Sequence, residues 1–217
     1  MKSMLLIGMG KFGKVLGSKL LELGNEVMIV DKDEATINEL APMYTNSYIG
    51  NCTNEGVLRS LGVKNFDICF VAVGDDFQSS LEITSQLKEL GAKYVISKAE
   101  REIQAKFLLR NGADEIVYPE RDVAIKLATR CNANRIFDFI ELTSEVGIFE
   151  IAVPKKWIRH TIAELNIRKK YLLNVLAIKK GSAINPMPEP NYVFCPEDHI
   201  VLLGKPNDVI KISGKNS

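Results

Sequence analysis

Short apolar runs alternate with segments of helical periodicity over the first 120 residues. A run rich in Ile, Val and Leu predicts a strand, and apolar side chains three and four positions apart predict a helix, often ended by Gly or Pro. Strands are predicted at 4–7, 27–30, 47–49, 67–73, 94–97 and 115–118, and helices at 11–23, 34–43, 54–61, 77–90 and 102–109. This alternation is typical of an α/β fold, here a Rossmann-like doubly wound parallel sheet.

The pattern changes beyond residue 120. One long helix is predicted over 121–139, and the rest of the chain mixes short strands with short helices. Strands are predicted at 147–153, 172–179 and 200–203, a short helix at 161–165 and a short final element at 209–212. Four of the eight prolines fall between Pro186 and Pro196, which indicates a loop or a sheet edge. We therefore predict a first domain over 1–142, including the long crossover helix, and a small α+β domain over 143–217.

Composition narrows the class of protein. The chain has 217 residues, 46% of them hydrophobic and 25% charged, which is the balance of a soluble globular protein. Its 28 basic and 27 acidic residues leave a net charge of +1, which argues against a nucleic-acid partner. No apolar run approaches the roughly 20 residues that span a bilayer, so any membrane role is expected to come through a partner. The four cysteines form no CxxC pair and predict free thiols in the cytoplasm.

A glycine loop, Gly8-Met9-Gly10-Lys11-Phe12-Gly13, stands between the first predicted strand and the first predicted helix. In that context the three glycines permit a tight turn, a close approach of a phosphate and close packing of the helix on the strand. Asp31 ends the second strand about twenty residues later, where an acid accepts hydrogen bonds from a ribose and disfavours the 2′-phosphate of NADP. The alternative is that the glycines only make a tight turn.

The loop does not distinguish among NAD(H), ATP, ADP and AMP. Lys11 in the loop and Lys98 at the end of the fifth strand favour a ligand with a terminal phosphate group, although either lysine alone could be a surface charge. Tyr94 and Lys98 match the YxxxK of short-chain reductases, but on a strand they lie about 13 Å apart, whereas the motif needs one helix face. We therefore expect binding without chemistry, and no enzyme.

Several segments together resemble one known family. They are 7–13, Val30-Asp31, Gly50-Asn51-Cys52-Thr53, Phe66-Asp67, 73–80 and 112–122. They are similar to the KtrA/TrkA family, the cytosolic regulatory subunits of bacterial potassium transport systems. The resemblance covers almost the whole chain and implies an RCK (KTN) N-domain followed by an RCK C-domain. It also implies homodimers that assemble into an octameric ring on the cytoplasmic face of a potassium-translocating membrane subunit.

The resemblance implies a nucleotide site, with ATP favouring the active ring, ADP the inactive one, and NAD(H) bound in some relatives. The matching positions are Gly8, Gly10, Lys11, Phe12, Gly13, Asp31, Lys32, Asn51, Cys52, Thr53, Val73, Gly74, Lys98 and Glu120. Lys11 is usually Arg in the family, where it reaches the γ-phosphate across the dimer. Glu120 matches an acid that helps to hold a Mg, Ca or Na ion beside the nucleotide. Its alternative role is to complement the helix dipole.

The C-terminal domain is expected to bind a second ligand. In relatives from Gram-positive bacteria this part of the chain binds cyclic di-AMP between two C-domains, and the matching contacts are Ile167, Arg168, Asn174 and Pro188. Arg suits a phosphate and Asn suits a base edge. The sequence leaves open a redox sensor that binds NAD(H) with Cys52 beside the base, a small NAD-dependent oxidoreductase, and an assembly protein with a vestigial nucleotide site.

Overall fold

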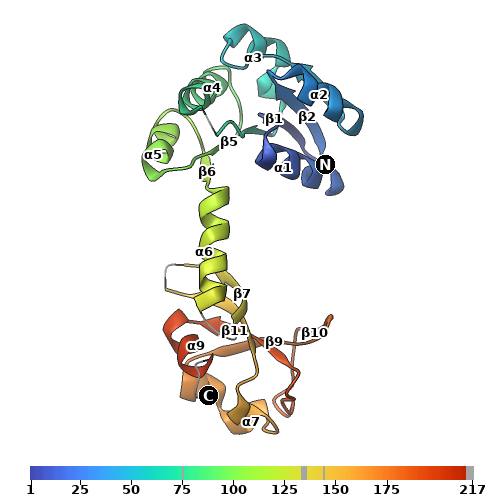
Figure 1. The fold of residues 1–217 in the computed structure, drawn as a ribbon. Helices are drawn as coiled ribbons and strands as arrows, with labels where there is room; N and C mark the ends of the chain where they lie inside the picture. Colours follow the sequence, from blue (N-terminus) through green and yellow to red (C-terminus); the bar gives the residue numbers. More distant parts are fainter. Residues whose placement is uncertain (75, 133–135, 144, 214–217) are drawn as a thin grey trace. The chain divides into compact units, whose positions relative to one another are not determined.

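The structure is a computed structural model that describes residues 1–74, 76–132, 136–143 and 145–213. The chain divides into two compact units, Met1–Arg121 and Asp122–Ser217, and each is described by itself (Figure 1). Among the described residues, no helix is long and apolar enough to span a membrane.

The first unit is built on a six-stranded sheet in which every pair of neighbours is parallel. Its strands are β1 (Ser3–Ile7), β2 (Glu26–Asp31), β3 (Asn46–Ile49), β4 (Ile68–Val71), β5 (Val95–Lys98) and β6 (Glu115–Val117). The spatial order β3-β2-β1-β4-β5-β6 is that of a doubly wound dinucleotide-binding fold, as the alternation of strands and helices predicts. The order reverses between β1 and β4, so the ends of these two strands flank the switch point.

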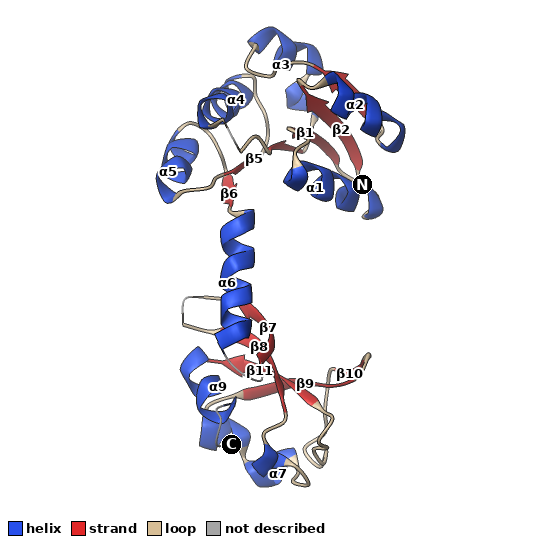
Figure 2. Ribbon diagram, viewed as in Figure 1, coloured by secondary structure: helices blue, strands red, loops and turns tan. Residues whose placement is uncertain are grey.

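Helices cover both faces of this sheet (Figure 2). They are α1 (Lys11–Glu22), α2 (Glu34–Leu40), α3 (Glu55–Leu61), α4 (Phe77–Glu89) and α5 (Glu102–Arg110), with short 3₁₀ turns η1 (Ala41–Met43) and η2 (Val63–Asn65). Side chains of β1 alternate between two cores, because successive residues of a strand point to opposite faces. Leu6 packs with α1 and α2, whereas Leu5 and Ile7 pack with α3 and α4.

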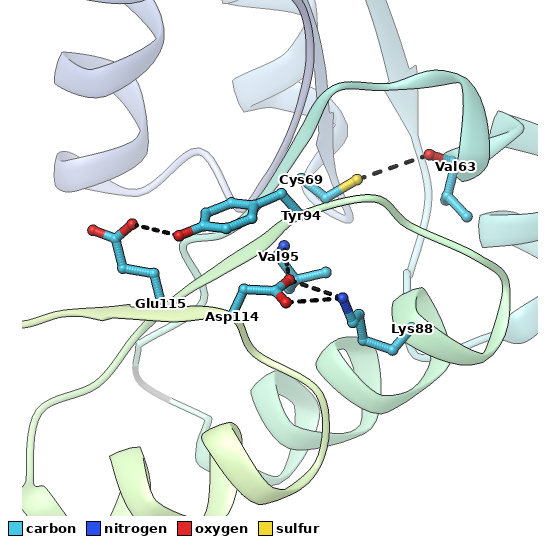
Figure 3. A network of polar contacts seen from close by, with 7 residues as sticks. All are labelled: Val63, Cys69, Lys88, Tyr94, Val95, Asp114 and Glu115. Atoms are coloured by element: carbon cyan, nitrogen blue, oxygen red, sulfur yellow. Dashed lines mark hydrogen bonds and ion pairs between the residues drawn. The ribbon is translucent and has the colours of Figure 1, made fainter.

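The amino edge of the sheet is closed by the chain's own side chains (Figure 3). The Asp114 carboxylate accepts a hydrogen bond from Val95 N at 2.7 Å and contacts Lys88 Nζ at 2.9 and 3.1 Å. The Tyr94 hydroxyl donates a hydrogen bond to Glu115 Oε2 at 3.1 Å. These contacts connect α4 to the starts of β5 and β6 at the amino edge of the sheet.

Helix α6 (Pro119–Asn132) begins with Pro at its first position, which suits a helix start, and carries the chain out of the first unit. The prediction of one helix over 121–139 is wrong beyond residue 132, and residues 133–135 lie outside the described part. Residues Ile136–Glu141 form strand β7 instead. This segment is rich in aromatic and β-branched residues, which favour a strand, and pairing with β8 stabilises it in that form. β7 belongs to the second sheet although it precedes residue 143.

The second unit holds a five-stranded antiparallel sheet in the order β10-β9-β11-β8-β7. Its other strands are β8 (Gly147–Ala152), β9 (Asn174–Lys180), β10 (Ala183–Asn185) and β11 (His199–Gly204). Its helices are η3 (Lys155–Trp157), α7 (Ile162–Leu165), α8 (Ile167–Tyr171) and α9 (Pro206–Ser213). One core lies on this sheet, with Trp157, Phe149 and Phe194 almost fully buried. The small α+β second domain is thus confirmed, and the proline-rich stretch follows edge strand β10.

Candidate functional site

A cavity of about 270 Å³ opens at the carboxyl edge of the parallel sheet. It is lined by Ile7, Gly8, Gly10, Asp31, Lys32, Gly50, Asn51, Cys52, Ala72, Val73, Gly74, Asp76, Ser79 and Ile83. Ile7 ends β1 and Ala72 follows β4, so the cavity lies at the switch point of the sheet. Ligands of open α/β sheets bind at this position, because the loops there diverge to opposite faces.

The glycine loop has the shape that the sequence predicts. Gly8 has a φ of +96°, a conformation that favours glycine, and its N–H donates to Val30 O at 2.9 Å. A Cβ on Gly13 would collide with the Gly8 carbonyl oxygen, so α1 can approach the strand only with glycine there. A Cβ on Gly10 would meet no described protein atom within 4 Å. Since Gly10 lines the cavity, the room beside it is available to a ligand.

Asp31 holds this loop in place. Its Oδ2 accepts a hydrogen bond from Met9 N at 2.6 Å, and its Oδ1 accepts one from Asp33 N at 2.9 Å. Met9 lies between the first two glycines, so one carboxylate connects the loop to the end of β2. The same carboxylate lines the cavity and could accept from ribose hydroxyls there.

The cavity lining also contains the amide of Asn51 and the thiol of Cys52. Asn51 Oδ1 accepts from Thr53 N at 3.1 Å and from Thr53 Oγ1 at 3.0 Å, which orders the turn before α3. The Cys52 side chain is buried, and burial together with the charge of Asp31 raises the pKa of its thiol to about 12. A thiol with that pKa stays protonated at neutral pH and reacts poorly with oxidants. This disfavours Cys52 as a redox sensor.

Lys98 lies directly beside the cavity although it is not part of the lining. Its side chain is 10% exposed, and its Nζ is 2.9 Å from Glu120 Oε1 and 3.9 Å from Glu100 Oε1. A Cβ on Gly74, which does line the cavity, would lie 2.8 Å from that nitrogen. The hydrogen bond from Lys98 holds the pKa of Glu120 below its usual value, so the acid is ionised at neutral pH.

The predicted site residues divide into two groups. Eight of them line the cavity: Gly8, Gly10, Asp31, Lys32, Asn51, Cys52, Val73 and Gly74. Of the others, Lys11 is exposed, and Phe12 packs against the core that lies between the sheet and helices α1 and α2. Gly13 contacts Gly8, Thr53 turns toward Asn51, and Lys98 and Glu120 pair beside the cavity.

Other lining residues lay outside the prediction: Ile7, Gly50, Ala72, Asp76, Ser79 and Ile83. Asp76 had a readable signal, because an Asp directly before the first residue of a predicted helix is typical of an N-cap. Its carboxylate accepts from Ser79 N at 3.1 Å and from Ser79 Oγ at 2.6 Å, so α4 starts with both side chains at the cavity. Ile7, Ala72 and Ile83 gave no such signal, since each has the apolar pattern of a core position.

The residues of the predicted second site lie on α8, at the start of β9 and near β10. Arg168 and Asn174 are exposed and Pro188 is half-buried. Ile167 is 3% exposed and belongs to the core of the second unit, so its side chain offers no surface to a ligand. The segment carries backbone strain, because Leu172 has a φ of +57° and an exposed side chain.

Metal and thiol chemistry have few candidates in the described residues. No cluster of three or more His, Cys, Asp or Glu side chains that could hold a metal ion occurs there. Cys52, Cys69 and Cys195 are free thiols, and the Cys131 side chain lies outside the described residues.

Fold and cavity together define a class: a dinucleotide-type parallel domain followed by a small antiparallel domain. Residues 4–119 match the TrkA-N domain and residues 146–214 match the TrkA-C domain. The chain therefore belongs to the KtrA/TrkA family of RCK proteins, as its motifs predict.

Its relatives include named potassium uptake proteins. The chain is 38% identical to the Ktr system potassium uptake protein C of Bacillus subtilis and 35% identical to protein A of the same organism. Each comparison covers 96% of this chain and 94% of the relative. The protein A of Vibrio alginolyticus is 31% identical over 94% of this chain and 92% of the relative.

Solved structures share the fold at low sequence identity. The GsuK channel superposes with a TM-score of 0.74 at 17% identity over 99% of this chain. The GsuK channel bound to NAD gives a TM-score of 0.72 at 16% identity, also over 99% of this chain. The chain spans 40% of each of these structures, so the likeness concerns the two-domain fold and not a whole channel.

Proposed function

We propose that this protein is a regulatory subunit of a potassium uptake system and acts by binding a nucleotide, without catalysis. Its similarity to the Ktr proteins over nearly their full length supports the role in potassium transport. The main support for nucleotide binding is the cavity at the switch point, with the free space beside Gly10. The partner is a potassium-translocating membrane subunit, on whose cytoplasmic face the chain assembles as an octameric ring of dimers.

The ligand we propose is ATP or ADP. In this proposal Asp31, which lines the cavity, accepts from a ribose, and the N-terminus of α1, which has no side-chain cap, donates N–H groups to phosphates. Lys98 beside Gly74 supplies a positive charge next to the same cavity. Related folds with ligands include GsuK bound to NAD, GsuK bound to ADP and a Kef C-terminal domain bound to AMP, so NAD(H) is the competing ligand.

The mechanism we propose is conformational. A ligand with more phosphate charge is attracted more strongly by Lys98. If the ligand contacts Lys98 in one conformation of the protein and not in another, it favours the first by the difference in its binding free energy for the two. ATP and ADP would thereby favour different shapes of the dimer, and the ring would transmit the difference to the membrane subunit. A cation held near Glu120 would screen the added charge.

A steric block at Gly10 tests nucleotide binding. The Gly10 backbone (φ −67°, ψ −172°) accepts any residue, and the Cβ of Gly10→Val meets no described protein atom within 4 Å at a position that lines the cavity. Calorimetric titration of the full chain with ATP, ADP and NADH should give an affinity at least about tenfold weaker for the variant. The matched control is Ser18→Val, which adds the same side chain on an exposed position of the same helix.

The outcomes separate the candidate functions. Gly10→Val that binds all three ligands as tightly as the wild type would contradict a nucleotide site in this cavity. A wild type that binds NADH far more tightly than ATP and ADP would favour the redox sensor. Steady turnover of NADH with a carbonyl substrate would favour the oxidoreductase.

For the second unit we propose a cyclic di-AMP site on α8 and the start of β9. Arg168 and Asn174 are exposed, which leaves a guanidinium for a phosphate and an amide for a base edge. Arg168→Ala should weaken cyclic di-AMP binding about tenfold or more and leave ATP binding unchanged. Lys169→Ala removes a neighbouring exposed charge from the same helix and is the control. A wild type that binds no cyclic di-AMP at micromolar ligand would rule this site out.

A further inference from the structure

One lysine touches both the wall of the cavity and the first turn of α6. Lys98 Nζ lies 2.9 Å from Glu120 Oε1, and Glu120 is the second residue of α6. The same nitrogen fills the space that a side chain on Gly74 would need, and Gly74 lines the cavity. A second hollow, lined by Ala99, Glu100, Glu120 and Arg121, lies next to this ion pair.

The two partners differ greatly in exposure. The Lys98 side chain is 10% exposed and the Glu120 side chain is 67% exposed. A lysine with so little contact with water needs an anionic partner, because an unpaired buried charge is costly. An exposed carboxylate returns to water at little cost. The lysine therefore needs an acceptor, whereas the glutamate can give up its donor.

We propose that Glu120 is a positioning residue that competes with ligand phosphate for Lys98 and so sets how strongly the cavity prefers highly charged ligands. The inference rests on the nucleotide site proposed above. While Glu120 neutralises Lys98, an incoming phosphate meets a cation already paired. When phosphate takes over Lys98, the first turn of α6 loses its contact with the end of β5, so ligand charge is coupled to the start of this helix.

The test compares ligands of rising charge on the full chain. Adenosine, AMP, ADP and ATP are titrated by calorimetry in a buffer with EDTA, so that a cation bound at Glu120 plays no part. Glu120→Gln should bind ADP and ATP about two- to fivefold more tightly than the wild type, because Lys98 then keeps only its longer, 3.9 Å contact with Glu100. Adenosine, which has no phosphate, should bind both proteins equally.

Two further variants control for other causes. Glu102→Gln removes another exposed carboxylate, which lies 3.4 Å from Arg121 of the same first turn, and should leave all four affinities unchanged. Lys98→Met should weaken ATP binding, and adding Glu120→Gln to it should restore nothing. Hydrogen exchange supplies a readout independent of affinity, since ATP should speed exchange at the start of α6 in the wild type.

The outcomes separate this inference from the proposed function. If the wild type binds ATP but Glu120→Gln binds it no more tightly, or gains equally for adenosine, Glu120 does not compete and only the inference is wrong. A gain that persists in the Lys98→Met background would also overturn it. If the wild type binds none of the four ligands, the proposed nucleotide site itself is wrong.

Discussion

The two units present their candidate sites in different ways. In the first unit, strand ends and four glycines line the cavity, together with a carboxylate that accepts from backbone N–H groups. In the second, the candidate residues are exposed side chains on a short helix and a strand end. A site built from backbone depends on the fold of its own unit, whereas a site of exposed side chains depends on the contacts that each side chain makes with the ligand. Four experiments, from the largest expected effect to the smallest, test this difference.

The largest effect is expected from Trp157→Ala, which removes the largest fully buried side chain of the second unit. The cavity left behind should cost that unit about 3–5 kcal/mol of unfolding free energy and leave ATP binding by the first unit intact. Calorimetric melting with parallel ATP titration checks both. Trp157→Phe is the control, because in the described residues the indole Nε1 has no hydrogen-bond partner to lose. Loss of ATP binding together with the second unit would mean that the units do not fold independently.

The next effect concerns the close approach of α1 to β1. Gly13→Ala forces a Cβ against the Gly8 carbonyl and should cost about 1–3 kcal/mol, with weaker ATP binding because the loop shifts. Gly17→Ala in the same helix is the matched comparison, since the atoms nearest its Cβ belong to the side chains of Tyr44 and Leu6 and not to the backbone. Equal losses in urea unfolding for the two variants would show that the Gly8–Gly13 contact is not special.

A pH-dependent effect is expected at the amino edge of the first sheet. Burial alone would raise the pKa of Asp114, but hydrogen bonds from Lys88 and from Val95 N outweigh it and hold the pKa below its usual value. The stabilisation is therefore present above the unfolded pKa of about 3.9 and is lost as pH falls through the lower folded pKa.

Asp114→Asn should accordingly cost about 1 kcal/mol at pH 7 and much less at pH 3. Urea unfolding at both pH values measures the difference. Glu22→Gln, which breaks an exposed pair with Lys19, should show no such dependence. A deficit that stays the same at pH 3 would contradict the role of the carboxylate charge.

The smallest effect compares one helix cap from each unit. Asn54 accepts from Gly56 N at the start of α3, and Thr161 accepts from Glu164 N at the start of α7. Asn54→Ala and Thr161→Ala should each cost about 0.5 kcal/mol, the low end for a cap, because both caps are exposed. In calorimetric melting of the full chain, each variant should lower the melting temperature of its own unit only. A shift of both transitions by either change would show coupling between the units.

Most of the first unit could be predicted from sequence because local signals agree with the tertiary fold. Glycines end its helices in the left-handed conformation at Gly24, Gly62 and Gly91, where a turn requires positive φ. The predicted strand over 67–73 is longer than β4, which ends at Val71. Ala72 and Val73 continue the apolar run but line the cavity, and an apolar side chain gives no sign of which role it has.

The second unit was harder to predict because its elements do not follow the regular alternation of strand and helix that the first unit has. β7 and β10 were missed, and both are edge strands, each defined by pairing with one neighbour. Ile167 was predicted at a ligand site, but its side chain lies in the core. The apolar positions around it are too few to fix the orientation of a five-residue helix such as α8.

The two hydrogen bonds that Asp31 accepts have a kinetic consequence. They hold the glycine loop in shape through contacts within the protein, so an arriving ligand has little backbone to order. The association rate constant should therefore be high and similar for all ligands that fit the cavity. A ribose hydroxyl must share Asp31 with Met9 N, so ligands that differ in the ribose should differ in how long they stay bound.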